Sequence, residues 1–328
     1  MAQPNLPSES VRRADQLETT GAVLPAAVIA DEELVQERIS SPMGDAIHRF
    51  RRNWAALISL TVILLLVVGA IFAPFLRTMD PTANNYLLLD AFPSAHHWFG
   101  TNGLGEDEYS RILFGLRVPL IVGIVGAAIT MVLGSLFGVF AGYFGGLLDN
   151  LLARFADVMF AFPSFTLALI VVSLYGNALD PYFAGAGRVM ILIIVFAIVG
   201  WPALMRFVRS LALGMKEQQF VEAARTLGGT DWQIIRRHLL PNMWGLILVQ
   251  SSFLVISFIG TEAILSIFGL GVEAPAPDLG AMLFAGASDL GVNYWEAIFP
   301  SIFLTVLILS FTFLGDGIRD AVDPRGQS

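Results

Sequence analysis

The chain has 328 residues, of which 55% are hydrophobic and only 14% are charged, with a formal net charge of −8. Soluble domains carry about a quarter charged residues, so this composition favours a protein that uses the lipid bilayer as its solvent. The sequence has no basic stripe, which excludes nucleic acid as an expected partner. Cysteine is absent, so disulfides and cysteine chemistry are excluded as well.

Residues 1–47 form a polar, acidic segment ahead of the first apolar run, and they include Pro4, Pro7 and Pro25. A segment of this kind cannot bury enough apolar surface to offset the entropy lost on ordering. We therefore expect a flexible cytoplasmic tail at this end of the chain.

Six apolar segments follow, and a helix needs roughly 20 such residues to cross the hydrocarbon core. Backbone groups find no water in that core, so the segments should be helical, and the lack of strand alternation argues against a barrel. We expect spans over approximately residues 54–76, 118–141, 157–178, 189–209, 242–268 and 296–315. The expected fold class is an all-α membrane protein with six transmembrane helices.

Small residues and prolines inside these spans bear on helix packing. Gly134, Gly138 and Gly142 recur at four-residue spacing, which lets helix backbones approach closely in lipid. The pattern fits packing within one bundle and contact with another subunit equally well. Pro163 and Pro202 each remove a backbone donor, so each is expected to kink its helix.

The basic residues predict the orientation. With the N-terminus inside, and leaving out the three arginines of the distal N-terminal tail, twelve basic residues fall in cytoplasmic segments and four in outer segments. Because cytoplasmic loops carry the excess of Lys and Arg, both termini are expected in the cytoplasm. The expected organisation is a cytoplasmic tail over 1–47, the first span with an outer loop over 48–117, a five-helix core over 118–318 that includes a cytoplasmic loop over 217–241, and a cytoplasmic tail over 319–328.

The loop over 217–241 lies between the fourth and fifth spans and has the pattern of a helix, a break and a second helix. Good helix formers occupy residues 217–227, and Phe220, Ala224 and Leu227 are spaced to share one apolar face. Two interpretations remain open for the apolar faces of this unit. They pack on the ends of the spans, or one of them docks into a partner.

The break in this loop has its own signature. Gly228 and Gly229 suit the left-handed turn that ends a helix, and Thr230 suits an N-cap with Gln233 in capping-box register. The second apolar face is expected to consist of Trp232, Ile235 and Leu239, and Pro241 is expected to end the unit and open the fifth span.

The same loop carries a family resemblance. The run Glu222-Ala223-Ala224, then Gly228, then Leu240-Pro241 resembles the EAA loop of ATP-binding-cassette (ABC) import permeases in both spacing and placement. His238, three residues before the proline, is similar to the dipeptide, oligopeptide and nickel branch of these permeases.

Other segments resemble the same branch. Residues 99–111 are similar to its FGTDxLGRDxxSR segment, except that Asn102 replaces an aspartate and Glu106 replaces an arginine, which puts the role of that basic residue in doubt. Further matches lie at residues 141–146, 161–164, 265–271 and 314–325. The resemblance covers about residues 48–325 and is closest to the C-type permease of dipeptide importers.

The resemblance implies a type I ABC importer permease fold in a bacterial inner membrane, with dipeptides or oligopeptides as cargo. It also implies partners: a second, homologous permease, two ATP-binding subunits, an extracytoplasmic solute-binding protein and membrane lipid. The residues implied in coupling to the ATPase subunits are Glu222, Ala223, Ala224, Gly228, Thr230, Leu240 and Pro241.

Catalytic and cofactor signatures are missing from the sequence. A P-loop needs GxxxxGK[ST], and the only lysine, Lys216, stands in no such context. The chain is therefore expected to be no enzyme and to hold no cofactor, with ATP and Mg²⁺ bound by the partner subunits. His96 and His97 are adjacent in a loop, and we expect them to be solvated, with no metal site.

Ionisable residues in membrane spans are candidates for function. Asp157 and Glu262 are candidates for the transport pathway or for a subunit contact. Arg154 offers Asp157 a simple interfacial ion pair instead, and the two roles for Glu262 stay open.

Three alternatives to peptide import remain. Nickel or another small solute is a second cargo for the same kind of permease. An ion-driven secondary transporter usually shows an internal repeat with broken helices, which is not evident here. A membrane-embedded enzyme is disfavoured by the missing catalytic signatures.

Overall fold

The computed structural model describes residues 42–183, 186–288 and 290–322. Of the expected N-terminal tail over 1–47, residues 1–41 lie outside the described residues. Of the expected C-terminal tail over 319–328, residues 323–328 lie outside them. The chain divides into two units, Met1–Asp45 and Ala46–Ser328, and the following account concerns the second unit.

The described elements are helices, and a single isolated bridge between Thr101 and Asp107 is the only strand-like pairing among the described residues. In chain order the helices are α3 (Pro42–Arg52), α4 (Trp54–Ile71), α5 (Ala73–Leu76), α6 (Glu108–Gly115), α7 (Arg117–Phe144), α8 (Gly146–Ala161), α9 (Ser164–Tyr175), α10 (Asp180–Phe183), α11 (Gly187–Met215), α12 (Gln219–Thr226), α13 (Asp231–Ile234), α14 (Leu240–Ile267), α15 (Leu279–Ser288) and α16 (Tyr294–Val322), with a π-helical segment, Ile235–Leu239, between α13 and α14.

Five stretches of helix among the described residues are long and apolar enough to cross a membrane, and the count is six when α8 and α9 form one bent span. The five are Trp54–Ile71, Glu108–Phe144, Gly187–Met215, Asp231–Ile267 and Tyr294–Val322. The expected all-α membrane class is confirmed. Several spans are longer than the sequence indicates, because α6 leads into α7 and α13 leads into α14.

The third span differs most from its prediction over 157–178. Helix α8 begins earlier, at Gly146, and α9 ends at Tyr175, with a bend of 76° between them. The break falls at Phe162 and Pro163, which both have extended ψ angles. Proline removes a backbone donor and disfavours helical geometry in the residue before it, so the expected kink is a full break. Pro202, in contrast, lies inside the uninterrupted α11.

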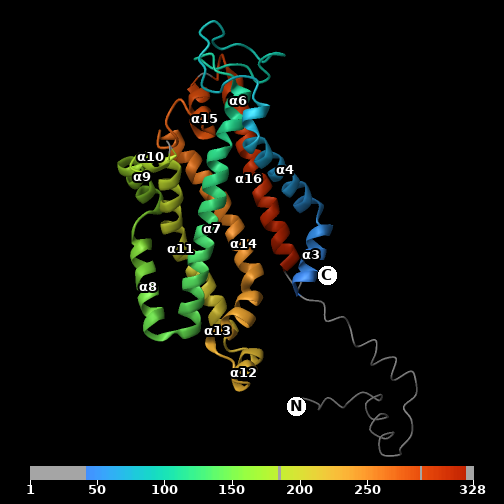
Figure 1. Cartoon of the computed structure of the whole chain (residues 1–328), viewed down its shortest axis with the longest axis vertical. Helices are drawn as coiled ribbons and strands as arrows, with labels where there is room; N and C mark the ends of the chain where they lie inside the picture. The colour runs from blue at the N-terminus through green and yellow to red at the C-terminus, as the bar shows by residue number, and fades with distance from the viewer. Residues whose placement is uncertain (1–41, 184–185, 289, 323–328) are drawn as a thin grey trace, which may run out of the picture. The chain divides into compact units, whose positions relative to one another are not determined.

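Helices α7 and α11 pack closely, and the glycines of α7 explain how (Figure 1). A Cβ atom added at Gly134 would come within 2.8 Å of Leu204, and one at Gly138 would come within 2.7 Å of the Met205 carbonyl oxygen. Gly142 meets α11 in the same way. The glycine pattern therefore serves packing inside this chain, which decides between the two arrangements that the sequence left open.

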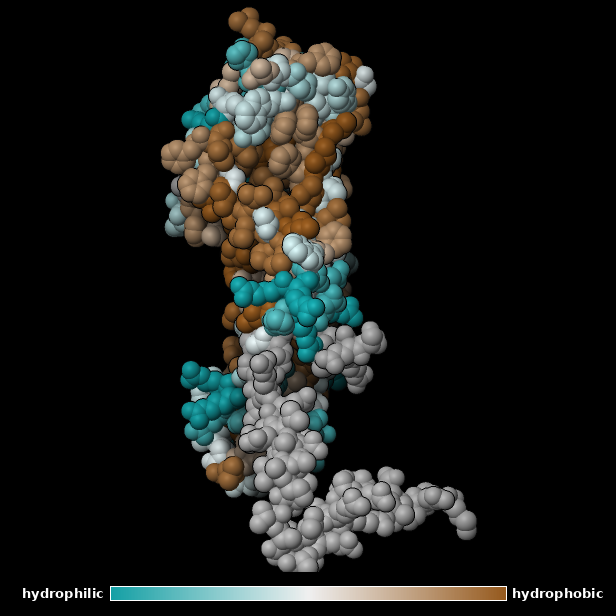
Figure 2. Space-filling model, turned by 90° about the vertical axis from the view of Figure 1, so that its right-hand side faces the viewer, coloured by the Kyte–Doolittle hydropathy of each residue, from teal (hydrophilic) through white to brown (hydrophobic). Residues whose placement is uncertain are grey.

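Helix α16 lies against α4, α14 and α15, while α7 also packs on α14. The outer side of α4 stays apolar and is not covered by the described part of the chain, as at Ile58, Leu65 and Ile71, each at least 60% exposed. Figure 2 shows this hydrophobic flank, with hydrophilic residues gathered below it. Apolar helix surfaces of this kind are expected where lipid is the solvent.

Candidate functional site

The 217–241 loop begins with α12, which starts at Gln219, two residues later than expected. The helix ends at a left-handed glycine, because Gly228 has φ +81°. The backbone N–H of Gly229 donates to the carbonyl oxygen of Ala224 at 3.0 Å, which closes the last turn. The predicted left-handed turn is confirmed at Gly228, and an added Cβ there would meet no atom within 4 Å.

A capping box starts the second helix, as predicted. The backbone N–H of Gln233 donates to the Thr230 hydroxyl oxygen at 3.3 Å, and the backbone N–H of Thr230 donates to Gln233 Oε1 at 3.1 Å. These reciprocal bonds satisfy two donors that the start of a helix otherwise leaves without partners.

Pro241 lies at the start of α14 and so opens the fifth span, as predicted, but the second helix of the loop does not end there, which corrects the other half of the prediction. Helix α13, the π-helical segment and α14 run on as one helical stretch from Asp231 to Ile267. Pro241 lies in the first turn of α14, where its missing N–H costs little. The loop is therefore built directly onto the fifth span, because its second half continues into that span as one helical stretch.

The buried side of this loop differs from the expected faces. Val221 is fully buried and packs in one cluster with Ile234, Ile235 and Leu239, against Tyr143 at the end of α7. Ile235 and Leu239 belong to the expected second face, but Trp232 is 57% exposed and Val221 was not expected at all. Phe220 and Val221 are adjacent and both apolar, so spacing alone cannot tell which of them points inward.

Of the expected α12 face, Phe220 and Leu227 point outward, which favours the docking interpretation, whereas Ala224 packs in part against the buried cluster. Leu227 is 89% exposed and Phe220 is 40% exposed. They border a surface groove of about 360 Å³ whose lining is Phe220, Ala223, Ala224, Leu227, Gly229, Gln233, Ile234, Arg237 and His238. We call this the loop groove. Exposed apolar surface of this kind commonly marks an interaction site.

The seven sequence candidates occupy different positions around this groove. Ala223 and Ala224 line it, and Gly228 and Thr230 shape the turn beside it. Glu222 is exposed on α12. Leu240 and Pro241 lie at the start of α14, away from the groove lining, so they connect the loop to the span.

The loop is tied to the end of α7 by polar contacts that the sequence did not indicate. The Tyr143 hydroxyl donates to Asp231 Oδ1 at 2.7 Å, and the Arg225 guanidinium lies 5.4 Å from the centre of the Tyr143 ring. Interaction with this tyrosine holds the pKa of Arg225 above its ordinary value. Lys216 Nζ donates to the Gly142 carbonyl oxygen at 3.2 Å. Tyr143 lies in the segment 141–146 that resembles the family, but nothing in the sequence around it indicates these partners.

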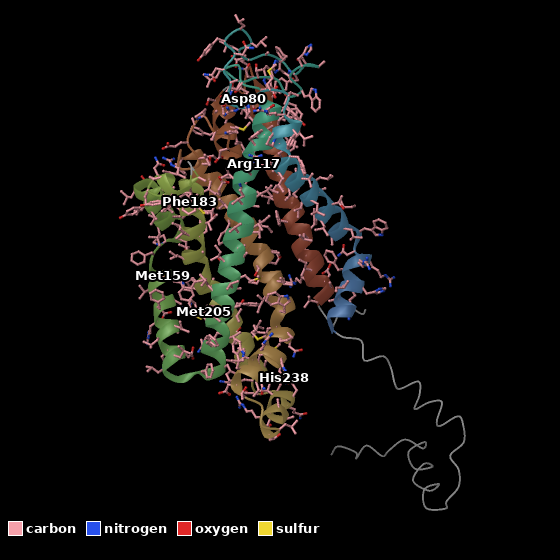
Figure 3. The ribbon with its side chains drawn as sticks, viewed as in Figure 1. Asp80, Arg117, Met159, Phe183, Met205 and His238 are labelled. Carbon is pink, nitrogen blue, oxygen red and sulfur yellow. The ribbon has the colours of Figure 1, made fainter. Side chains whose placement is uncertain are left out.

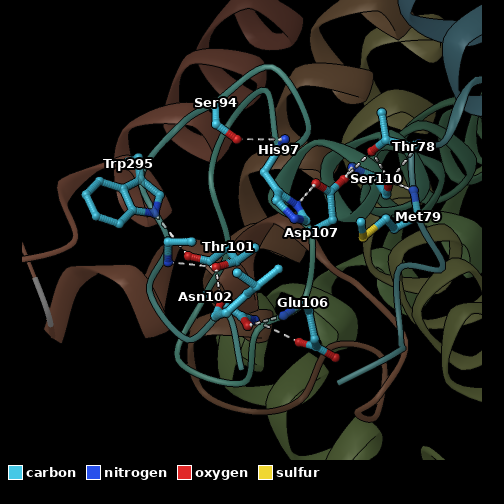
Figure 4. Close-up of polar contacts among 12 residues, drawn as sticks. Thr78, Met79, Ser94, His97, Thr101, Asn102, Glu106, Asp107, Ser110 and Trp295 are labelled. Atoms are coloured by element: carbon cyan, nitrogen blue, oxygen red, sulfur yellow. Dashed lines mark hydrogen bonds and ion pairs between the residues drawn. The ribbon is translucent and has the colours of Figure 1, made fainter. Parts of the chain in front are cut away.

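A second polar cluster lies at the other end of the helices, around residues 97–111 (Figure 4). Figure 3 places Asp80 and Arg117 at this end and His238 at the loop end. Asp107 caps α6 by accepting from the Ser110 backbone at 2.9 Å, and it also accepts from Thr78 at 2.7 Å. Its other oxygen lies 2.9 Å from His97 Nδ1.

His97 is only 4% exposed, so the prediction that both histidines are solvated is wrong for His97. His96 is exposed, as predicted. The reason is Asp107, which supplies a buried hydrogen-bond partner ten residues further along the chain. Within the described ranges, no group of three or more His, Cys, Asp or Glu side chains is arranged to hold a metal ion.

The two departures from the family pattern contact each other. Asn102 Nδ2 donates to Glu106 Oε2 at 2.7 Å, and Arg111 forms an ion pair with the same carboxylate. Glu106 is 2% exposed, so these partners offset the cost of burying its carboxylate. Beside this pair, Trp295 donates its ring N–H to the Thr101 carbonyl oxygen at 3.0 Å and ties α16 to the segment.

Asp157 and Glu262 have separate surroundings. Asp157, on α8, forms an ion pair with Arg206 on α11 and lies 3.7 Å from Arg154. It therefore joins two helices, beyond the local pair with Arg154 that the sequence offers. Glu262, on α14, is 1% exposed and interacts electrostatically with Asp278.

Comparison with known proteins identifies the family. Residues 134–327 match the model of the binding-protein-dependent transport system inner membrane component, and residues 41–93 match the N-terminal transmembrane domain of oligopeptide transport permease C. The chain belongs to this family of transport permeases.

Named relatives agree along most of the chain. The glutathione transport system permease protein GsiD of Pectobacterium atrosepticum is 37% identical over 306 residues, which cover 92% of this chain and 98% of the relative. The oligopeptide transport system permease protein OppC of Bacillus subtilis is 35% identical over 302 residues, which cover 92% and 96%. The resemblance to the dipeptide, oligopeptide and nickel branch is confirmed.

The fold also has a solved counterpart. An inward-facing form of the MetNI methionine ABC transporter aligns with a TM-score of 0.50 and 19% sequence identity, covering 65% of this chain and 96% of that one. The chain is thus a multi-pass membrane protein, the permease subunit of an ABC importer, and it works within a multi-subunit transporter.

Proposed function

We propose that this permease imports dipeptides or oligopeptides and forms half of the translocation pathway together with a second, homologous permease. The named cargoes of its relatives, oligopeptides and glutathione, support a peptide. Nickel or another small solute is the alternative cargo.

The observation that carries the coupling part of the proposal is the loop groove. Its apolar wall, with Leu227 89% exposed, has no cover from the described part of this chain. The groove is carried on α12 and α13, which are fixed by buried side chains and by the Tyr143 bond. A rigid, exposed apolar groove suits docking by an ATPase subunit, with Ala223 and Ala224 at the contact.

In this proposal the chain does not hydrolyse ATP. Its sequence has no P-loop, so we assign ATP and Mg²⁺ to two partner ATPase subunits. The chain itself contributes a docking surface that continues into the fifth span, since Asp231–Ile267 is one helical stretch. Movement of a docked ATPase would then reach the membrane helices directly.

The proposal places the loop groove and both termini in the cytoplasm of a bacterial cell, as the bias of basic residues supports. The segment over 77–107 is then outside, where an extracytoplasmic solute-binding protein would deliver cargo. The core over 118–318 serves as the permease proper, in contact with lipid and with the second permease.

One transport assay tests these assignments. The transporter is purified as an assembled complex through a tag on this chain, reconstituted in proteoliposomes with its solute-binding protein, and supplied with ATP on the side of the ATPase subunits. We expect ATP-dependent uptake of radiolabelled trialanine. ATP-dependent nickel uptake without peptide uptake would favour the alternative cargo, and uptake driven by an ion gradient without ATP would contradict the proposal.

A further inference from the structure

A cavity of about 190 Å³ lies between α6, α15 and the start of α16, at the end of the helices opposite to the loop groove. Its polar lining consists of Asn102, Glu108, Arg111, Asp278 and Glu296. The rest of the lining is apolar and includes exposed alanines of the segment after α14, which place its rim at the surface. None of these groups belongs to the coupling loop.

Glu108 is the residue in this cavity whose carboxylate lacks a hydrogen-bond partner at one oxygen. It follows the cap of α6 and is only 2% exposed. Its Oε2 atom is buried and has no hydrogen-bond partner in the described part of the chain. A buried carboxylate oxygen without a partner is costly, so native proteins supply a donor or a positive charge to such a group.

The neighbouring charges do not supply that partner. Arg111 forms its ion pair with Glu106. Asp278 caps α15 and accepts hydrogen bonds from Ser266 at 2.6 Å and from the Gly280 backbone at 2.8 Å. The carboxylate of Glu296 interacts electrostatically with Glu108 and adds negative charge. The charge of Arg111 also acts favourably on Glu108, but the lining holds three carboxylates, those of Glu108, Asp278 and Glu296, against this one guanidinium. The cavity therefore attracts a positive group.

The cavity also offers a donor. Arg111 Nε is buried and has no hydrogen-bond partner among the described residues, although Nη1 of the same guanidinium binds both Glu106 and the Pro81 carbonyl oxygen. An unpartnered donor beside an unpartnered acceptor fits a ligand that carries both kinds of group. The absence of a metal-holding cluster in the described residues gives a metal ion no support here.

We propose that this cavity binds the amino end of a peptide, with the α-ammonium group at Glu108 and the adjacent carbonyl oxygen at Arg111 Nε. The volume agrees, because roughly 300–1,000 Å³ encloses a whole drug-sized ligand, whereas about 190 Å³ takes one end of a longer one. This inference rests on the proposed peptide cargo, and it adds a recognition site within the permease itself.

The test uses the assembled transporter, purified through a tag on this chain and without its solute-binding protein. The probe is glycinamide, which has an ammonium group and a carbonyl group, and the matched probe is N-acetylglycinamide, which lacks the ammonium. The thermal unfolding midpoint is followed at constant ionic strength. We expect a saturable rise with glycinamide only, because a ligand that binds the folded state raises its stability.

Glu108→Gln keeps the size of the side chain and removes its charge. Since a hydrogen bond to a charged group is worth about a factor of 10 or more in affinity, the apparent affinity for glycinamide should fall at least that far. Asp80→Asn, at an exposed carboxylate of the same outer segment, should leave it unchanged.

Several results would overturn the inference. They are the absence of a saturable shift with the unsubstituted protein, an equal effect of N-acetylglycinamide, and unchanged affinity in Glu108→Gln. A Glu108→Gln protein that is more stable than the unsubstituted one, with no glycinamide effect in either, would mean that a proton neutralises the carboxylate. Any of these results combined with ATP-dependent trialanine uptake would leave the proposed function intact. Specific glycinamide binding without peptide uptake would refute the function instead.

Discussion

The Tyr143 hydroxyl at the end of α7 donates a 2.7 Å hydrogen bond to Asp231, the first residue of α13. This bond joins the loop that carries the groove to a helix from a distant part of the chain. The same tyrosine ring lies under Arg225 of α12, so both short helices of the loop are held by one side chain.

Tyr143→Phe removes this hydrogen bond and keeps the ring. Hydrogen bonds to charged groups contribute about 1.5–3 kcal/mol, so the loop should open more often by a factor of roughly 10 or more. Hydrogen exchange of the backbone amides over 219–234 should be faster in the assembled transporter. Tyr175→Phe, at an exposed tyrosine of α9, is the control. Equal exchange in the two variants would show that the bond does not hold the loop.

Gly228→Val should weaken ATPase association and uptake while leaving the membrane level of the chain unchanged. Valine is disfavoured at φ +81° by about 1–2 kcal/mol or more, although an added Cβ has free space there. Gly228→Ala should have a milder effect. Co-purification of the ATPase, peptide uptake and membrane level are measured together.

Gly214→Val is the matched control for this change. Gly214 lies in α11, has an ordinary φ and also has free space around its Cβ position. It should therefore tolerate valine. Normal uptake with Gly228→Val would show that the turn is not needed for coupling to the ATPase. Loss of the chain from the membrane would show instead that the turn is needed for folding.

Leu227→Asp should abolish ATPase co-purification without unfolding the chain. Leu227 is 89% exposed at the groove, so the charge costs little in the free subunit and disrupts an apolar contact in the complex. Leu87→Asp, at a side chain that is 94% exposed in the outer segment, should leave co-purification unchanged. If both variants retain the ATPase, the groove is not the docking surface.

Asp107→Ala should lower the free energy of unfolding by about 3 kcal/mol, and with it the midpoint of thermal unfolding, because a buried carboxylate with several partners is lost. Asp107 caps α6 and holds His97 and Thr78. Asp80→Ala, at an exposed position, should have little effect. A similar midpoint of thermal unfolding in both variants would show that the cluster around Asp107 does not support the outer segment.

Single cysteines test the orientation cleanly, because the chain contains none of its own. Ser288→Cys should react with an impermeant maleimide in intact cells, and Thr230→Cys should react only after permeabilisation. Both side chains are exposed. The reverse labelling pattern would overturn the assignment of the groove to the cytoplasm.

The features that the sequence predicts correctly are local ones. The left-handed Gly228 and the capping box of Thr230 with Gln233 depend on residues at most three apart, so their chemistry can be recognised without the fold. The apolar spans are local as well, since length and hydrophobicity decide whether a helix can cross a bilayer.

What only the tertiary structure decides is which neighbour each side chain meets. Phe220 and Val221 are both apolar, and packing against α7 and α13 buries the second and exposes the first. Helix α8 carries Asp149 and Asp157 because Arg209 and Arg206 of α11 neutralise them, so it can begin at Gly146, earlier than its hydrophobicity predicts. His97 is buried because Asp107 is brought to it by the fold of the outer segment. The free-energy cost of burying a polar or charged side chain depends on hydrogen-bond and ion-pair partners that are distant in the chain, and the spacing of residues along one sequence does not reveal those partners.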